Sequence, residues 1–372
     1  MSGSAASLSQ RPDLNWLRAC AVVEVVITHS DLAIKHFSQN ILRSGSYIPF
    51  SGVGVEIFFL LSGYLICLNA PTYRNALEFL RSRALRIFPM YIIFTFITLA
   101  ARLINPSWTW NGYDLSVGTL LRSFLILPQS WFPIVGVGWS LEHEVIFYEL
   151  TALMMAGIGL ARGKRIWFGF GLVILGWIGL GLGFQPIDGT WYHHLFSVLM
   201  IAFGLGWLYC CYEQSRDGVV LKIIAVCAIG TTLLLVVTDP MNTEKVLRIA
   251  GSAAFCLIVV RQRGRIRPGG RADRLIAPIG AAAYSIYLSH WFVLSGFGKL
   301  LGYLQMPAET ALALRVCVIV VSLGVGLLVY AALERPLDRW LRAGQTFREA
   351  FTVLRMKPDL PGRTVPKAVI PS

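Results

Sequence analysis

The chain has 372 residues, of which 55% are hydrophobic and only 14% are charged. Soluble domains carry about 25% charged residues, so this composition excludes an ordinary soluble globular protein. Several apolar runs reach the roughly 20 residues that a helix needs to cross a bilayer. The net charge of +13 would suit nucleic acid, but in a membrane protein it reflects basic cytoplasmic loops. We therefore expect a lipid bilayer around the chain and no nucleic-acid partner.

The seven cysteines all fall inside apolar runs, and no C-x-x-C motif occurs. An odd number without that spacing is typical of small buried hydrophobic residues, not of disulfides. The histidines show no i, i+4 pair with a fixed third ligand, so we expect no metal site. We also expect no bound cofactor.

The apolar runs predict an all-α polytopic membrane protein with about ten transmembrane helices. In chain order the predicted spans are 14–35, 52–69, 84–104, 139–160, 166–184, 193–212, 219–238, 245–261, 276–300 and 312–333. The first run carries Glu24 and His29 and no small-residue cleavage site follows it, which favours a retained helix over a signal peptide. This gives an N-terminal tail over 1–13, one transmembrane domain over 14–333 and a C-terminal tail over 334–372.

The basic residues predict the orientation. The two tails and the alternate loops between spans hold 24 of the 33 lysines and arginines, whereas the opposite connections hold 7. Under the positive-inside rule this asymmetry places both termini in the cytoplasm. We expect a multi-pass protein of the inner (plasma) membrane, and the sequence leaves open whether it forms a homo-oligomer.

The first predicted span carries Arg18 and His29, eleven residues apart. At ~100° per residue this separation is three helical turns within ~20°, so both side chains lie on one face. Ionisable groups at membrane depth are costly and usually mark a pathway or a reaction. Glu24 lies ~140° away from His29 by the same arithmetic and is interpreted as a packing or pairing group.

Three further predicted spans carry polar groups at their outer ends. We predict that Glu56, Glu144 and His290 join His29 in the outer half of the membrane, with Tyr287 one turn from His290. Their convergence in the membrane plane is a hypothesis. The remaining polar groups near these ends are interpreted as solvated or surface residues: Glu142, His143, His193 and His194.

Arg83 and Arg86 share a face at the predicted inner start of the third span. Guanidinium forks suit phosphate oxygens, so a phosphate-bearing donor could dock there from the cytoplasm. The alternative is a simple topology signal. At the far end, His29 could take a proton from a sugar hydroxyl or could carry the acyl group itself.

The connection 105–138 is rich in tryptophan and holds an apolar stretch, 117–127, that is too short to span. Its tryptophans suit either a headgroup-level aromatic belt or a platform on which sugar rings stack. The aromatic residues concerned are Trp108, Trp110, Tyr113, Trp131 and Phe132.

A set of short motifs occurs in one order along residues 14 to about 340. They are Leu17-Arg18 with His29, Gly54-Val-Glu-Ile-Phe-Phe-Leu-Leu-Ser-Gly-Tyr-Leu, Arg83-Ala-Leu-Arg86-Ile-Phe-Pro, Trp139-Ser-Leu-x-x-Glu144-x-x-Phe-Tyr148, Tyr284-Ser-Ile-Tyr-Leu-x-His290 and Glu334-Arg-Pro-Leu. With this set the chain resembles the membrane acyltransferase family 3, O-acyltransferases that modify polysaccharides, lipopolysaccharide and some antibiotics.

The resemblance implies ten helices, an acyl-CoA donor (most often acetyl-CoA) reached from the cytoplasm, and an acceptor hydroxyl outside. It implies that His29 is essential and that Arg83 and Arg86 handle the donor, while Glu144 and His290 match a recurring acid and a late histidine. We accordingly expect catalysis by His29 and Glu144. The expected substrate-binding residues are Arg18, Glu56, Arg83, Arg86, Tyr287 and His290.

The sequence also departs from the family pattern. Val145 stands where a second acid is frequent, and Glu142 replaces a usual small residue, which puts a paired-acid role in doubt. No hydrolase-like domain follows the last span, so we expect the membrane domain alone to handle a carbohydrate acceptor, either exopolysaccharide or a lipid-linked sugar. A small-molecule acceptor such as a macrolide is the alternative within this enzyme class. A transporter or flippase for a lipid-linked sugar would show inverted repeats, which we do not find, and a non-enzymatic scaffold would leave the buried histidine without a purpose.

Overall fold

A computed structural model describes residues 11–37, 52–105, 115–184, 191–238, 243–262, 265–304 and 308–343. Every regular element in these ranges is helical. The first half of the chain forms α1 (Pro12–Phe37), α2 (Val53–Asn69), α3 (Ala76–Ile104), α4 (Val117–Leu125), α5 (Trp139–Leu153), α6 (Arg162–Gly181) and α7 (Trp191–Leu195). The second half forms α8 (Leu199–Ser215), α9 (Gly218–Thr238), α10 (Thr243–Arg261), α11 (Arg271–Ala281), α12 (Ala283–Leu304), α13 (Ala308–Val329) and α14 (Arg335–Ala343).

The helical class predicted from the sequence is confirmed, and each predicted span overlaps a helix of the structure. Within the described residues, five helical stretches are long and apolar enough to cross a membrane. These are Val53–Thr72, Ala76–Ile104, Arg162–Gly181, Trp191–Ser215 and Leu314–Arg342. The full number of ten spans and the cytoplasmic position of both termini stay predictions.

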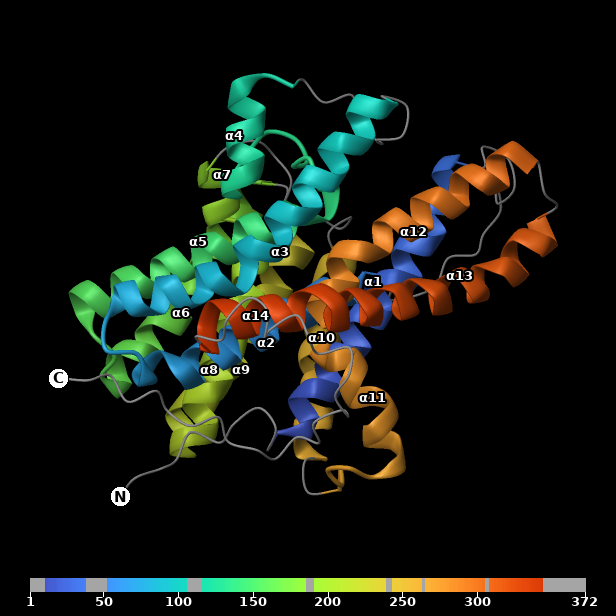
Figure 1. The fold of residues 1–372 in the computed structure, drawn as a ribbon. Helices are drawn as coiled ribbons and strands as arrows, with labels where there is room; N and C mark the ends of the chain where they lie inside the picture. Colours follow the sequence, from blue (N-terminus) through green and yellow to red (C-terminus); the bar gives the residue numbers. More distant parts are fainter. Residues whose placement is uncertain are drawn as a thin grey trace.

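Helix α1 lies at the centre of the bundle. It packs against α2 and α10 on one side and against α11, α12 and α13 on the other (Figure 1). Helix α2 in turn packs along α8, which also contacts α6 and α9. The side of α1 that carries Arg18 and His29 therefore lies against other helices of the bundle.

The crossing of α2 and α8 depends on two glycines. A methyl group at Gly63 would lie 2.1 Å from the carbonyl oxygen of Phe203, and one at Gly206 would lie 1.9 Å from the carbonyl oxygen of Leu60. Small residues let the backbones of two membrane helices approach this closely, which compensates for the weak hydrophobic drive between helices in lipid. Each glycine thus fixes the position of the partner helix.

The predicted span 276–300 is not continuous in the structure. Helix α11 ends at Ala281 and α12 begins at Ala283, because the backbone of Ala282 between them leaves the helical conformation, with φ −87° and ψ 6°. A second irregularity follows α13, where Tyr330–Glu334 forms a π-helical turn. Such turns are frequent at functional sites, and this one presents Glu334 to α3.

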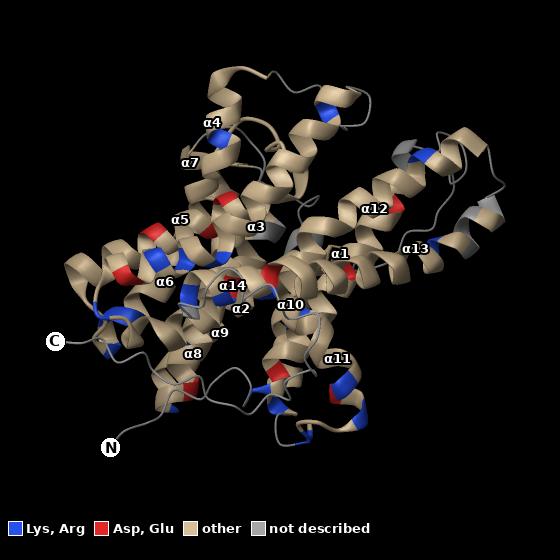
Figure 2. Ribbon diagram, viewed as in Figure 1, with Lys and Arg blue, Asp and Glu red and all other residues tan. Residues whose placement is uncertain are grey.

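Basic side chains are unevenly distributed over the bundle. Figure 2 shows most of the described lysines and arginines in the lower half of the view, around α6, α11 and α14, with few near α4 and α12. The apolar stretch predicted at 117–127 forms the short helix α4, which begins after the N-cap Ser116. Trp108, Trp110 and Tyr113 lie outside the described residues.

Candidate active site

His29 on α1 and His290 on α12 face each other. Nδ1 of His29 lies 2.7 Å from Nε2 of His290, and the two rings are nearly parallel, with 5° between their planes. Trp291 packs edge-on against His29 with ring centroids 5.7 Å apart. His290 is fully buried and His29 is half-buried. The structure thus brings together the two histidines that the sequence predicted to converge.

The hydrogen-bond partners assign a tautomer to each neutral ring. Nδ1 of His290 lies 3.1 Å from the carbonyl oxygen of Ile286, which can only accept, so this nitrogen carries the proton. Nε2 of His290 then has a lone pair and accepts a hydrogen bond from Nδ1–H of His29. Nε2 of His29 is left unprotonated, which is the form that a general base requires.

Arg315 on α13 holds the segment of α1 around His29. Its Nε donates to the Ser30 hydroxyl over 2.8 Å, and its Nη2 donates to the carbonyl oxygen of Ile27 over 3.1 Å. Asp31 completes the contact at 3.5 Å. These two hydrogen bonds from the planar, buried guanidinium group of Arg315 fix the rotation of α1 about its axis, and thus the direction of the His29 ring.

A polar cavity of about 150 Å³ lies beside this pair, between α1, α2, α3, α5 and α12. It collects most of the residues that the sequence predicted to bind substrate. The ionisable and hydroxyl groups in its lining are Arg18, Ser62, Arg83, Arg86, Ser140, Glu144, Tyr148, Tyr284 and Tyr287. Neither His29 nor His290 lines this cavity directly.

Arg83 and Arg86 stand inside α3 and not at its start, because this helix begins at Ala76 and not at 84 as predicted. Arg83 donates to the Tyr73 hydroxyl over 2.5 Å, and Arg86 pairs with Glu334 at 2.5 Å. Their side chains reach the same cavity as Glu144 on α5. The sequence had placed the arginines and Glu144 at opposite depths; the longer helix and the long arginine side chains bring them together.

Arg18 and Glu144 differ in their partners. Glu144 accepts hydrogen bonds from Ser62, over 3.0 Å, and from Tyr148. Arg18 lies within electrostatic range of Glu144, Arg83 and Arg86, but it makes no hydrogen bond or ion pair with any other residue in the described ranges. The cavity lining therefore holds three guanidinium groups and one carboxylate, that of Glu144, and it favours an anionic ligand.

Tyr287 separates the polar cavity from the histidine pair. It lines the cavity, and its ring lies 5.9 Å from the ring of His290, one helical turn along α12. Its hydroxyl contacts the Ser140 hydroxyl at 2.7 Å and donates to the carbonyl oxygen of Val137. These bonds tie α12 to the first turn of α5 and to the 3₁₀ turn Gly136–Gly138 before it, so Tyr287 forms part of the cavity wall.

Glu56 does not join this group. Its carboxylate pairs with Arg248 on α10 at 3.1 Å. Arg248 also donates to the carbonyl oxygen of Gly52, and Glu24 accepts hydrogen bonds from the backbone N–H groups of Gly52 and Gly54. Glu56 and Glu24 thus belong to the contact that fixes the start of α2, as the pairing role of Glu24 predicted.

The sequence interpretation of Glu142, His143 and His194 as solvated groups is wrong. All three are buried, and Nε2 of His194 lies 2.8 Å from a carboxylate oxygen of Glu142, whose other oxygen accepts from Gln129. The ring of His143 packs on that of His194, with centroids 4.5 Å apart. The short helix α7 folds over the start of α5 and supplies His194, a contact that spacing along the chain cannot show.

Sequence reasoning passed over two residues of the site. Arg315 was treated only as part of a span, although an arginine in an apolar run is itself a signal of function. Glu334 was noted in a motif and given no role, yet it is buried and accepts from both Arg86 and the Ser285 hydroxyl, each over 2.5 Å.

Comparisons with known proteins agree with this arrangement. A sequence model of the acyltransferase domain family matches residues 11–331. The chain is 25% identical to Acyltransferase MdmB of Streptomyces mycarofaciens over 89% of its own length and 92% of that protein. It is also 25% identical to the Exopolysaccharide production protein ExoZ of Rhizobium meliloti, over 81% of this chain and 94% of that protein. No solved structure matches.

The matched range begins just before α1 and ends within the π-helical turn after α13, so it includes both histidines and the polar cavity. The chain therefore belongs to the acyltransferase domain family and is a membrane acyltransferase.

Proposed function

We propose that this protein transfers an acyl group, acetyl in particular, from acyl-CoA on the cytoplasmic side to a hydroxyl of an exopolysaccharide or lipid-linked sugar at the outer face. The observation that carries the proposal is the contact of Nδ1 of His29 with Nε2 of His290, beside a cavity with excess positive charge. With Nδ1 of His290 against the Ile286 carbonyl oxygen, this contact assigns Nε2 of His29 the unprotonated form. A base next to an anion-binding cavity is what transfer from a phosphate-bearing thioester requires.

The step proceeds at Nε2 of His29. The acceptor oxygen bonds to the thioester carbonyl carbon while its proton moves to Nε2. The carbon–sulfur bond then breaks, and the departing sulfur takes this proton, which leaves an ester, CoA thiol and a neutral His29. His290 accepts from Nδ1–H of His29 throughout and stabilises the transient imidazolium. Positioned general bases of this kind contribute roughly 10²- to 10⁴-fold in rate.

The arginines of the cavity support a role in donor binding. Arg86 is paired with Glu334 and Arg83 is anchored on Tyr73, so both guanidinium groups are held in place. Arg18 has no such partner among the residues that the structure describes, and it offers its donors to the ligand. Glu144 is bonded to Ser62 and Tyr148, and we assign it the positioning of Arg18 and of the cavity wall rather than proton transfer.

The exopolysaccharide acceptor draws on the printed name of one relative and on the predicted outward orientation of α1. The decisive experiment incubates the purified full chain with labelled acetyl-CoA and either extracellular glycans of the host, lipid-linked oligosaccharide or a macrolide, and follows ester formation by mass spectrometry. We expect label on a sugar hydroxyl. Label on the macrolide alone would show that the acceptor is a small molecule and not a carbohydrate. Label on none of the three acceptors would refute the proposed reaction.

The role of His29 is tested in the same assay. His29→Ala should lower the rate roughly 10²- to 10⁴-fold while the protein stays folded and inserted. Acceptor-free incubation distinguishes a base from an acyl carrier, because only a carrier releases one equivalent of CoA and retains label on the protein. Wild-type rates in His29→Ala would contradict both roles.

A further inference from the structure

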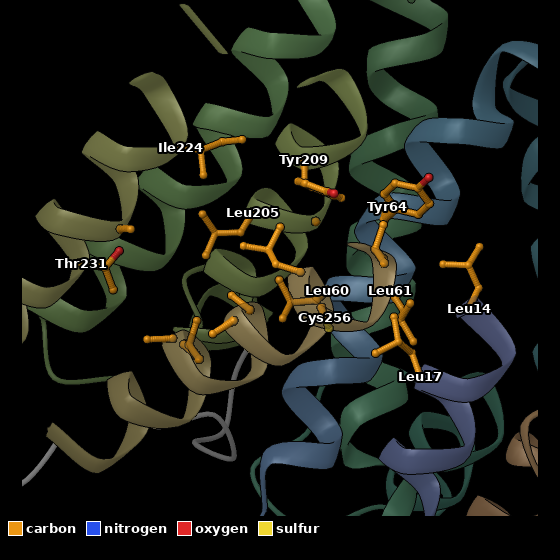
Figure 3. Close-up of a pocket in the computed structure, with 18 of the residues that line it drawn as sticks. Leu14, Leu17, Leu60, Leu61, Tyr64, Leu205, Tyr209, Ile224, Thr231 and Cys256 are labelled. Carbon is orange, nitrogen blue, oxygen red and sulfur yellow. The ribbon is translucent and has the colours of Figure 1, made fainter. Parts of the chain in front are cut away.

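A second cavity, of about 300 Å³, lies between α1, α2, α8, α9 and α10. Figure 3 shows Leu14 and Leu17 of α1 on one side of it and Ile224 and Thr231 of α9 on the other. Its lining is mostly aliphatic, with Tyr64, Tyr209, Thr231, Thr232 and Cys256 as the other members. The Thr231 hydroxyl donates to the carbonyl oxygen of Cys227 and accepts from the indole of Trp177, so its single donor is already used.

An apolar cavity of this kind does not hold water and instead takes an apolar ligand. If the cavity stays empty, the side chains that line it lack the dispersion contacts that a bound ligand would provide. Leu61 lines both this cavity and the polar one, so the two are neighbours, but the arginines that suit the acyl donor line only the polar cavity. In a bilayer the apolar group present in excess is the hydrocarbon chain of a lipid.

One end of the cavity is basic. The rings of Tyr64 and Tyr209 stand there with centroids 6.1 Å apart, and Val260 lines the cavity directly before Arg261. Arg216 and Arg261 both lie within electrostatic range of Tyr209. Neither forms an ion pair with any residue that the structure describes.

The other charges at this end are largely satisfied. Arg11 pairs with Asp13 at 2.8 Å and donates to the Tyr64 hydroxyl, which in turn donates to Glu213. Among the described residues named here, three arginines face two carboxylates, and the excess positive charge rests on Arg216 and Arg261. The predicted orientation puts this end at the cytoplasmic headgroup level, because α8 and α10 both end there.

We propose that this cavity binds an anionic phospholipid of the cytoplasmic leaflet, with one acyl chain between α2, α8, α9 and α10 and its phosphate on Arg216 and Arg261. A lipid acyl chain alone would bind with little preference for one lipid over another, since lipid tails are as apolar as leucine. The headgroup selects the lipid, because guanidinium groups form charge-assisted hydrogen bonds with phosphate oxygens. The site is separate from the proposed acyl transfer and does not depend on it.

Native mass spectrometry of the full chain, purified in detergent and supplied with phosphatidylglycerol or phosphatidylcholine, tests the site. We expect one phosphatidylglycerol retained per chain, with a preference over phosphatidylcholine of roughly fivefold for each arginine. Arg216→Asn with Arg261→Gln should abolish this preference, whereas the exposed Arg271→Gln should keep it. Equal retention of both lipids by the wild type would overturn the headgroup assignment.

The proposed position of the lipid acyl chain is tested by substitutions that fill the cavity. Ala228→Trp or Ala253→Trp should lower lipid retention at least tenfold, because both alanines line the cavity. Ala225→Trp is the matched control, since Ala225 is exposed on the same helix as Ala228 and lies outside the lining. Equal loss in the control, or none in either cavity variant, would refute the proposal.

A measurement on the wild type covers the case in which these variants misfold. Phosphatidylglycerol with a photoreactive diazirine in one acyl chain should label peptides of α8, α9 and α10 that line the cavity, and unlabelled phosphatidylglycerol should compete. Labelling confined to other helices would contradict the site. Competition by acyl-CoA but not by phosphatidylglycerol would assign the cavity to a long-chain donor instead.

Discussion

The guanidinium of Arg86 lies 2.5 Å from the carboxylate of Glu334, 248 residues further along the chain. The π-helical turn Tyr330–Glu334 delivers this carboxylate, and the Ser285 hydroxyl donates to its second oxygen. Glu334 is buried, whereas Arg86 is about one third exposed toward the polar cavity. The end of the transmembrane domain thus sets the geometry of an arginine in its third helix.

Glu334→Gln should release Arg86 from this geometry. The amide keeps the size of the side chain and a bond to Ser285 but removes the charge, so Arg86 turns freely in the cavity. We expect the KM for acyl-CoA to change by roughly tenfold with a smaller change in kcat, since a hydrogen bond to a charged group contributes about 1.5–3 kcal/mol. Steady-state kinetics at saturating acceptor measure this, and Asp217→Asn, which breaks the exposed pair with Arg162, is the control. An unchanged KM for acyl-CoA would show that Arg86 does not contribute to binding of the acyl donor.

Arg18 should contribute more to donor affinity than either arginine of α3. It faces the cavity without a hydrogen-bonded partner in the described ranges, so the ligand is the first group to satisfy its donors. Arg18→Gln should raise the KM for acyl-CoA roughly 10- to 100-fold by the same energy scale. Arg162→Gln on the surface should leave it unchanged. A lowered kcat at unchanged KM would instead place Arg18 at the reacting carbonyl.

Gly63→Ala should destabilise the bundle by about 1–3 kcal/mol, because the added methyl group overlaps the carbonyl oxygen of Phe203 and forces α2 from α8. Gly171→Ala on α6 is the matched control, since a methyl group there meets no atom within 4 Å. This control should be neutral or slightly stabilising. Thermal unfolding in detergent compares the two, and equal midpoints would show that the crossing tolerates a wider separation.

The sequence predicted the helical class, and each apolar run overlaps a helix of the structure, because apolar runs are local signals. It also predicted that His29 and His290 converge, since both are ionisable groups in apolar helices at one predicted depth. It could not show that Glu56 would pair with Arg248, because that choice depends on how α2 and α10 pack. The burial of His194 has the same origin: its partner Glu142 lies 52 residues away, on another helix.

Arg315 should act on the reaction through the orientation of His29. Arg315→Met removes both bonds to α1 while it keeps an apolar side chain of similar length, so α1 can rotate. We expect kcat to fall at least tenfold with little change in the KM for acyl-CoA. Arg315→Lys should recover part of this loss, because an ammonium can still reach Ser30 or the Ile27 carbonyl. Equal losses in both variants, with lower thermal stability in both, would indicate a purely structural role.

His290 should set the tautomer of His29, which two substitutions distinguish from simple packing. In His290→Gln the side-chain carbonyl can still accept from Nδ1–H of His29, whereas His290→Leu offers a similar volume and no acceptor. For histidines that bind a metal, the hydrogen-bonded partner that orients the ring contributes about 10- to 100-fold, and we expect the same scale for His29. We therefore expect kcat of His290→Leu to fall by that factor and that of His290→Gln to fall much less, at a similar KM for acyl-CoA in both. His193→Gln, which alters a half-buried histidine on α7, should leave kcat unchanged. If leucine and glutamine lowered kcat equally, the contact between the two rings would not orient the base, and the free nitrogen of His29 would need another explanation.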